Sequence, residues 1–279
     1  IFRSCSASYG GGFYAHTGSF SQEAESAVTF ENCTASRNGG GAHVKENFKQ
    51  APNSSAIFRS CSASLGGGLR TGGSFSQEAE SAVTFENCTA SGSGGSFGGG
   101  AHVNVNFTQG PSSSAIFRSC SASYGGGFYA HTGSFSQEAE SRVTFENCTA
   151  SGSGGGALVW GKKSFTQGFH SSTIFRSCSA RVDGGGLYTA GGFSQEAEST
   201  SGNGGGAHVK ENFTQAQQLR HLPQLQCECR WRRPPCLTLR TGSREFGALP
   251  ALLGRSGRRR CFEGGGLKTG GSFSQEAES

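Results

Sequence analysis

Residues 28–42 read Val-Thr-Phe-Glu-Asn-Cys-Thr-Ala-Ser-Arg-Asn-Gly-Gly-Gly-Ala, and this stretch decides the fold. Apolar and polar residues alternate through Val-Thr-Phe and again through Cys-Thr-Ala, as they do along half-buried strands. The three-residue step from Phe30 to Cys33 breaks the alternation. We therefore expect two short strands separated by a corner at Glu31 and Asn32, with both corner side chains pointing outward.

The stretch recurs along the chain in two alternating forms, Val-Thr-Phe-Glu-Asn-Cys-Thr-Ala and Ile-Phe-Arg-Ser-Cys-Ser-Ala. A second motif, Phe-x-Gln, keeps the same interval from Phe20 to Phe193. The cysteines of the first motif follow one another at intervals of 28, 28, 27, 32, 28 and 30 residues, at Cys5, Cys33, Cys61, Cys88, Cys120, Cys148 and Cys178. Two motifs in step indicate one structural coil per 27–32 residues.

Such a coil is glycine-rich and has no 3.6-residue apolar period, so helical repeats are disfavoured. It is too small to bury an apolar face alone and must stack on copies of itself. The predicted fold class is therefore all-β, a right-handed parallel β-helix (solenoid) with neighbouring coils about 4.8 Å apart.

Two files of side chains predict the order in which the coils stack. The expected outward file alternates in charge, as Arg3, Glu31, Arg59, Glu86, Arg118, Glu146 and Arg176. Sequential stacking would place opposite charges on neighbouring strands. The residue after each glycine triplet alternates between large and small, as Phe13, Ala42, Leu69, Ala101, Phe128, Ala157, Leu187 and Ala207, which suits interdigitated packing.

The Phe-x-Asn-Cys-x-Ala and Gly-Gly-Gly-Ala motifs of residues 30–42 resemble the Phe-x-x-Asn and Gly-Gly-Ala-aliphatic motifs of chlamydial polymorphic outer-membrane proteins. This resemblance covers residues 1–215 and 263–279. It implies a pectin-lyase-like β-helix and an adhesive, extracellular or cell-surface segment of a larger protein. Here cysteine stands for the asparagine of Phe-x-x-Asn, and His43 stands where an aliphatic residue is usual.

The sequence divides into three parts. Residues 1–215 hold the β-helix repeats, with the last coil truncated at 200–215, and residues 263–279 hold a further partial repeat. Residues 216–262 are irregular and contain ten arginines against Glu228 and Glu245. Back-translated and read one nucleotide later, residues 218–235 nearly repeat residues 173–187, so we interpret 216–262 as an out-of-frame or disordered insertion.

Charge and composition restrict the partners. The whole chain has a formal net charge of +5, and the irregular segment alone has +8. The rest of the chain therefore has 5 − 8 = −3. The repeats therefore offer no basic surface for nucleic acid. No run of about 18 apolar residues suggests a membrane span. The expected partners are glycans or surface proteins, and the oligomeric state stays open.

Cysteines, histidines and tyrosines are the side chains that could bind a metal or a ligand. The seven repeat cysteines are expected to be inward thiols, with cross-rung disulfides as the alternative. Cys227, Cys229, Cys236 and Cys261 have poor spacing for zinc, so no metal or cofactor is expected. The recurring histidines and tyrosines, including His43, His102 and Tyr129, are expected to form a solvated surface stripe, with a glycan-contacting stripe as the alternative.

The sequence is compatible with a structural or adhesive segment and with a polysaccharide-acting enzyme, and we rank an ice-binding face below both. A polysaccharide lyase or hydrolase would need a unique cluster of acidic groups. The chain has one aspartate, Asp183, and its glutamate pairs, such as Glu23 and Glu25, recur every second coil. We therefore expect a non-catalytic structural or adhesive segment with no catalytic residues, and a polysaccharide-acting enzyme or carbohydrate-binding module as the alternative.

Overall fold

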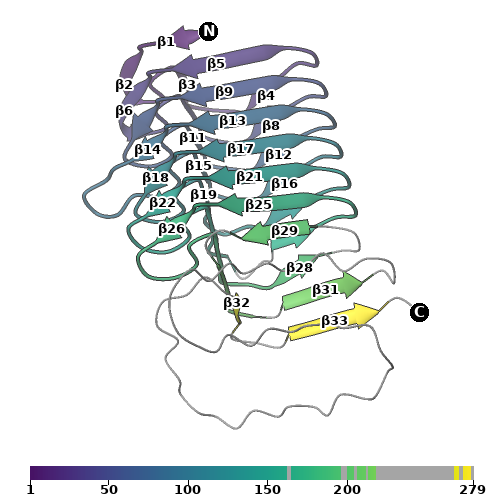
Figure 1. Cartoon of the computed structure of the whole chain (residues 1–279). Coiled ribbons are helices and arrows are strands. Elements are labelled where there is room, and N and C mark those ends of the chain that lie inside the picture. Colours follow the sequence, from purple (N-terminus) through teal and green to yellow (C-terminus); the bar gives the residue numbers. More distant parts are fainter. Residues whose placement is uncertain are drawn as a thin grey trace, which may run out of the picture.

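The computed structural model describes residues 1–161, 165–195, 200–203, 206–211, 213–217, 267–269 and 273–277, and the regular elements there are all strands. Every strand pairing is parallel, and each strand pairs with the equivalent strand of the next coil. Figure 1 shows the result as a stack of coils, in which β5 to β25 descend one beneath the other. The predicted all-β parallel β-helix is confirmed.

Four strand positions in the coil build four sheets, A to D. Sheet A contains β1 (Phe2–Arg3), β5 (Ala27–Glu31), β9 (Ser55–Arg59), β13 (Ala82–Glu86), β17 (Ser114–Arg118), β21 (Arg142–Glu146), β25 (Ser172–Arg176) and β29 (Thr200–Asn203). Sheet B contains β2 (Ser6–Tyr9), β6 (Thr34–Asn38), β10 (Ser62–Ala63), β14 (Thr89–Ala90), β18 (Ser121–Ala122), β22 (Thr149–Ala150) and β26 (Ser179–Ala180).

The other two sheets follow the glycine triplets and the Phe-x-Gln motifs. Sheet C contains β3 (Phe13–Ala15), β7 (Ala42–Val44), β11 (Leu69–Thr71), β15 (Ala101–Val103), β19 (Phe128–Ala130), β23 (Ala157–Val159), β27 (Leu187–Thr189), β30 (Ala207–Val209) and β32 (Leu267–Thr269). Sheet D contains β4 (Phe20–Gln22), β8 (Phe48–Gln50), β12 (Phe75–Gln77), β16 (Phe107–Gln109), β20 (Phe135–Gln137), β24 (Phe165–Gln167), β28 (Phe193–Gln195), β31 (Phe213–Gln217) and β33 (Phe273–Ala277).

Residues with positive φ mark the corners of each coil. The predicted corner between sheets A and B is confirmed, because Asn32 has a φ of 53° and the equivalent residues share that conformation, at Ser4, Ser60, Asn87, Ser119, Asn147 and Ser177. A second corner, between sheets D and A, holds Glu25, Asn53, Glu80, Ser112, Glu140 and His170. The first glycine of the triplets from Gly10 to Gly184 makes the third corner, as at Gly39 with a φ of 63°. This left-handed conformation explains the recurrence of Gly and Asn.

The core is a column of phenylalanines inside sheet A. Consecutive rings stack with centroids 4.8–5.0 Å apart and interplanar angles of 7–12°, along Phe2, Phe30, Phe58, Phe85, Phe117, Phe145 and Phe175. The large and small residues of sheet C stand opposite one another as predicted, for example Phe13 beside Ala42 and Ala42 beside Leu69. In-register stacking in sequential order therefore places equivalent side chains in contact.

A ladder of buried glutamines ties sheet D to sheet A, and the sequence interpretation had assigned these residues no role. Gln22 Nε2 donates to the Ser55 carbonyl oxygen at 2.7 Å, and Gln50 Nε2 donates to the Ala82 carbonyl at 3.0 Å. Each of these glutamines thus bonds to the first residue of a sheet A strand in the following coil, Gln22 to β9 and Gln50 to β13. Because glutamine lies two residues after the buried phenylalanine of Phe-x-Gln, strand alternation already places it inward.

The truncated coil differs from the prediction in one respect. The coil predicted to be truncated at 200–215 lacks the Val-Thr-Phe-Glu-Asn-Cys motif, yet it keeps a sheet A strand, because β29 pairs with β25, with Ser201 opposite Thr173. Sheet B ends at β26 instead, so the truncated coil has no described sheet B strand. Beyond it, β32 pairs with β30 and β33 pairs with β31. Of the segment predicted to be irregular, 216–262, Ala216 and Gln217 continue β31, and residues 218–262, with their four cysteines, lie outside the described residues.

Candidate functional site

The charge ladder runs along the outward end of sheet A. Glu31 lies between Arg3, with 2.8 Å from Nε to Oε2, and Arg59, with 3.8 Å from Nη1 to Oε1. The alternation continues through Arg59–Glu86 at 2.9 Å, Arg118–Glu86 at 4.0 Å and Arg118–Glu146 at 3.0 Å. Arg176 stands opposite Glu146 in the strand register. These glutamates are engaged by arginines on neighbouring coils, which makes them structural.

The cysteine file lies inside the corner between sheets A and B. Cys33, Cys61, Cys88, Cys120, Cys148 and Cys178 are buried, Cys5 is half-buried, and all seven are free thiols. Each thiol lies near backbone carbonyls, as Cys120 Sγ does at 3.6 Å from the Phe85 oxygen and 3.4 Å from the Arg118 oxygen. Burial raises the pKa of the Cys120 thiol well above its usual value. Burial keeps the six inner thiols of the file out of reach of a substrate, and on that ground we interpret the file as packing.

The histidine and tyrosine stripe is not the solvated surface that the sequence predicted. It occupies the central, outward-facing position of the sheet C strands, yet His43 and His102 are each 5% exposed and Tyr129 is 4% exposed. Aromatic residues that stand directly before glycine triplets cover it: Tyr9, at the end of β2, lies 5.6 Å from His43, and Phe97 lies 4.8 Å from Tyr129, between ring centroids. His16 and His131, at the ends of their strands, are exposed.

The covered stripe opens to solvent at Trp160, which follows β23. The Trp160 ring is 50% exposed and stacks on Tyr188, with centroids 6.3 Å apart and an interplanar angle of 15°. Lys210 Nζ lies 5.6 Å from the Trp160 ring centroid and 5.5 Å from that of Tyr188. On the same face, His208 Nδ1 lies 3.0 Å from Asp183 Oδ1. An exposed aromatic ring with adjacent donors can stack on a pyranose ring or on a partner's side chain.

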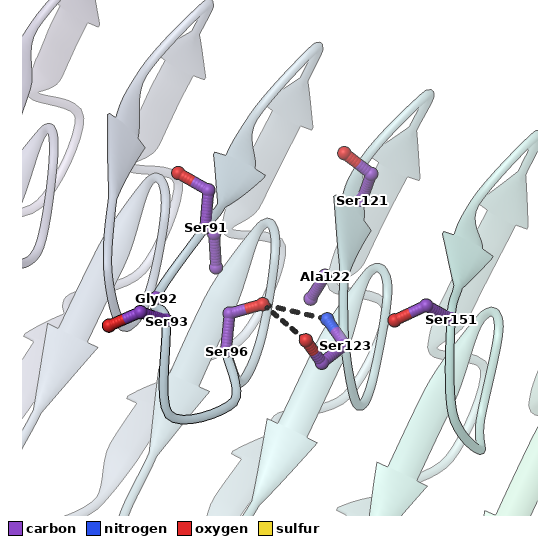
Figure 2. A pocket seen from close by; sticks show the side chains of 9 residues that line it. Ser91, Gly92, Ser93, Ser96, Ser121, Ala122, Ser123 and Ser151 are labelled. Atoms are coloured by element: carbon purple, nitrogen blue, oxygen red, sulfur yellow. Dashed lines mark hydrogen bonds between the residues drawn. The ribbon is translucent and has the colours of Figure 1, made fainter.

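The longest coil makes the second feature, a shallow hollow beside sheet B. The 32-residue interval between Cys88 and Cys120 places an additional loop here. A shallow hollow of about 490 Å³ lies there, lined by Ala90, Ser91, Gly92, Ser93, Ser96, Ser121, Ala122, Ser123 and Ser151. Figure 2 shows that these serines come from three successive coils and that Ser96 faces Ser123 of the next coil. Ser96 Oγ donates to Ser123 Oγ at 3.0 Å. Hydroxyls without a neighbouring base can hydrogen-bond polyols but cannot activate a nucleophile.

The recurring glutamate pairs sit at the corner between sheets D and A. Glu25, Glu80 and Glu140 are exposed and occupy its positive-φ position. Glu78 pairs with Lys49 of the preceding coil, 2.5 Å from Nζ to Oε1. In the described part of the chain no three His, Cys, Asp or Glu side chains converge as metal ligands. The pairs Glu196/Glu198 and Glu276/Glu278 lie outside the residues whose side chains are described.

Stacked parallel coils with a continuous inner column of phenylalanines define a β-solenoid. The family model for the right-handed β-helix region matches residues 2–174, and the chain belongs to this family. Comparisons with curated proteins and with solved structures return no match. Among the described residues, no helix is long and apolar enough to cross a membrane.

Proposed function

We propose that the chain is a non-catalytic binding segment of an extracellular or cell-surface protein, and that the outer face of sheet C contacts glycans or partner proteins. The observation that carries the proposal is the half-exposed Trp160, which lies beside the aromatic file of that face and contacts Tyr188 and Lys210. The motif resemblance to surface adhesins supports the location and the role.

The charged groups favour binding over catalysis. The ladder glutamates are held by arginines, and the corner glutamates recur in the same arrangement on every second coil. A glycosidase needs two carboxyl groups about 5–10 Å apart, held in distinct environments. Equivalent glutamates on equivalent coils do not provide that difference.

One observation favours the alternative of a polysaccharide-acting enzyme. Asp183 and His208 lie within 3.0 Å, on the same face as Tyr188 and Lys210. A carboxylate can orient a histidine as a general base. This cluster is the place where a catalytic role is to be tested.

The test is binding and turnover measured together on the full chain, with a panel of neutral and acidic polysaccharides. Trp160→Ala should weaken glycan binding about tenfold, the equivalent of about 1.4 kcal/mol for one stacking contact. The matched control is Phe169→Ala, because Phe169 is 39% exposed but lies at another corner. Equal loss in both variants, or no binding by the unmodified chain, would remove the proposal.

A further inference from the structure

Five consecutive strands of sheet C carry an unusual series at their central outward position: Tyr14, His43, Arg70, His102 and Tyr129. The strand register places each beside the next. Neighbouring strands lie about 4.8 Å apart, so Arg70 has a histidine on each side within about one strand spacing. The tyrosine rings close the series, with Tyr14 5.1 Å from His43 and Tyr129 4.9 Å from His102, between centroids.

Arg70 is a cation without a counter-ion. It is half-buried, and its Nε is buried with no hydrogen-bond partner, while Nη1 donates to the neighbouring Thr71 carbonyl. No carboxylate in the described part of the chain pairs with it, unlike the arginines of the ladder. Burial lowers the pKa of Arg70 to about 10. Holding an unpaired guanidinium away from water is costly, and a bound anion would offset that cost.

The two histidines add unused hydrogen-bonding atoms around the guanidinium. His102 is 5% exposed, and neither of its ring nitrogens has a partner; His43 Nδ1 is likewise unpartnered. Burial, followed by the charges of Arg70 and Lys45, lowers the pKa of His43 to about 4, so this ring is neutral at pH 7. A neutral imidazole keeps one N–H donor.

An anion can approach this series over the Arg70 side chain, which is half-buried and not fully enclosed. Gly72, which follows the Arg70 strand, opens no second route, because its neighbouring space is filled by the Lys45 carbonyl group. The other nearby charged groups are also cationic or engaged elsewhere: Arg37 donates to Tyr9, and Glu46 accepts from Ser19 at 3.2 Å.

We infer that Arg70, flanked by His43 and His102, forms a binding site for one small oxyanion group, a carboxylate or a sulfate. The Arg70 Nε–H and the imidazole N–H groups donate to its oxygens, and the anion neutralises the guanidinium. The group can be a free ion or a substituent of a larger molecule. The inference stands apart from the proposed function, because a free ion would occupy the site even if the chain bound no glycan.

The experiment titrates the full chain with sodium sulfate and sodium acetate at constant ionic strength, following the His43 and His102 side-chain signals by NMR. We expect saturable shifts at both histidines, and at least a tenfold loss of affinity in Arg70→Gln. The matched control is Arg142→Gln, since Arg142 is exposed on sheet A, and its affinity should equal that of the unmodified chain. Arg70→Lys keeps the positive charge but loses the planar guanidinium donors, so it should bind the anion more weakly than the unmodified chain.

Two results would overturn the inference: shifts that rise linearly without saturation, or the same affinity in Arg70→Gln and in the unmodified chain. If Arg70→Gln fails to fold, the Arg70→Lys titration decides, and an affinity equal to that of the unmodified chain counts against the site. A further arm compares acetate with a uronate oligosaccharide. Tighter binding of the oligosaccharide assigns the site to a substituent, and equal binding assigns it to a free ion.

Discussion

Replacing Phe117 with alanine removes the centre of the phenylalanine column. Phe117 is fully buried, and its ring centroid lies 4.9 Å from that of Phe85 and 4.8 Å from that of Phe145. Phe128 adds an edge contact at 5.9 Å. A buried Phe-to-Ala change costs about 3–5 kcal/mol. Because Phe117 loses stacking contacts on both sides, we expect about 4–5 kcal/mol, near the upper end.

The assay is urea unfolding followed by circular dichroism, combined with hydrogen exchange resolved along the chain. Phe2→Ala is the comparison, since Phe2 is half-buried and stacks on Phe30 alone, 4.9 Å away, in the column; about 1–2 kcal/mol is expected. Exchange in Phe117→Ala should accelerate in the coils on both sides, because each coil is stabilised by its neighbours. A loss below about 1 kcal/mol, or one no larger than that of Phe2→Ala, would refute the stacked-column explanation.

Three further predictions follow from the corners, the ladder and the buried histidines. Glu86→Arg loses two exposed ion pairs, with Arg59 and Arg118, and gains like-charge contacts with both. Urea unfolding at low salt should show a free energy of unfolding lower by about 1–3 kcal/mol. An equal loss of stability in 1 M salt would contradict an electrostatic cause. Glu80→Asn should stabilise the fold by up to about 1 kcal/mol in urea unfolding, because asparagine tolerates the φ of 57° better than glutamate. Glu80→Gln also removes the charge and should give no gain in stability. If Glu80→Gln stabilises the fold as much as Glu80→Asn, the effect is due to charge. His43 has a folded pKa of about 4 against 6.5 unfolded, so its contribution is complete above pH 6.5 and is lost as the pH falls toward 4, by at most about 3 kcal/mol. The difference between the urea midpoints at pH 7 and pH 5 should shrink in His43→Gln and persist in part, because burial also lowers the pKa of His102; an unchanged pH dependence would oppose this assignment.

The sequence predicted most of the fold because each coil repeats the same local constraints. The three-residue step from Phe30 to Cys33 located the corner now seen at Asn32, and the alternation of Phe13, Ala42 and Leu69 predicted the stacking order. These patterns depend on residues close in sequence and on a fixed interval. They could be read without knowing the tertiary structure.

The burial of the sheet C face could not be read in this way. Alternation correctly places His43 and His102 on the outward side, but their exposure depends on the aromatic residues that stand directly before glycine triplets, such as Tyr9 and Phe97. Phe97 precedes His102 by five residues, as Tyr9 precedes Tyr14 by five, so the interval itself was present in the sequence. The interval does not reveal that these rings pack against the sheet C side chains, which is a tertiary contact. The hollow beside Ser96 arises from one longer coil.

The proposal that this β-helix binds a polysaccharide without cleaving it can be tested by measuring polysaccharide chain length before and after incubation with the full protein. We expect a bound polysaccharide to be recovered at unchanged length and its retention to fall in Trp160→Ala. Shortened chains, produced by the unmodified protein and absent with Asp183→Asn or His208→Gln, would contradict it and identify an enzyme.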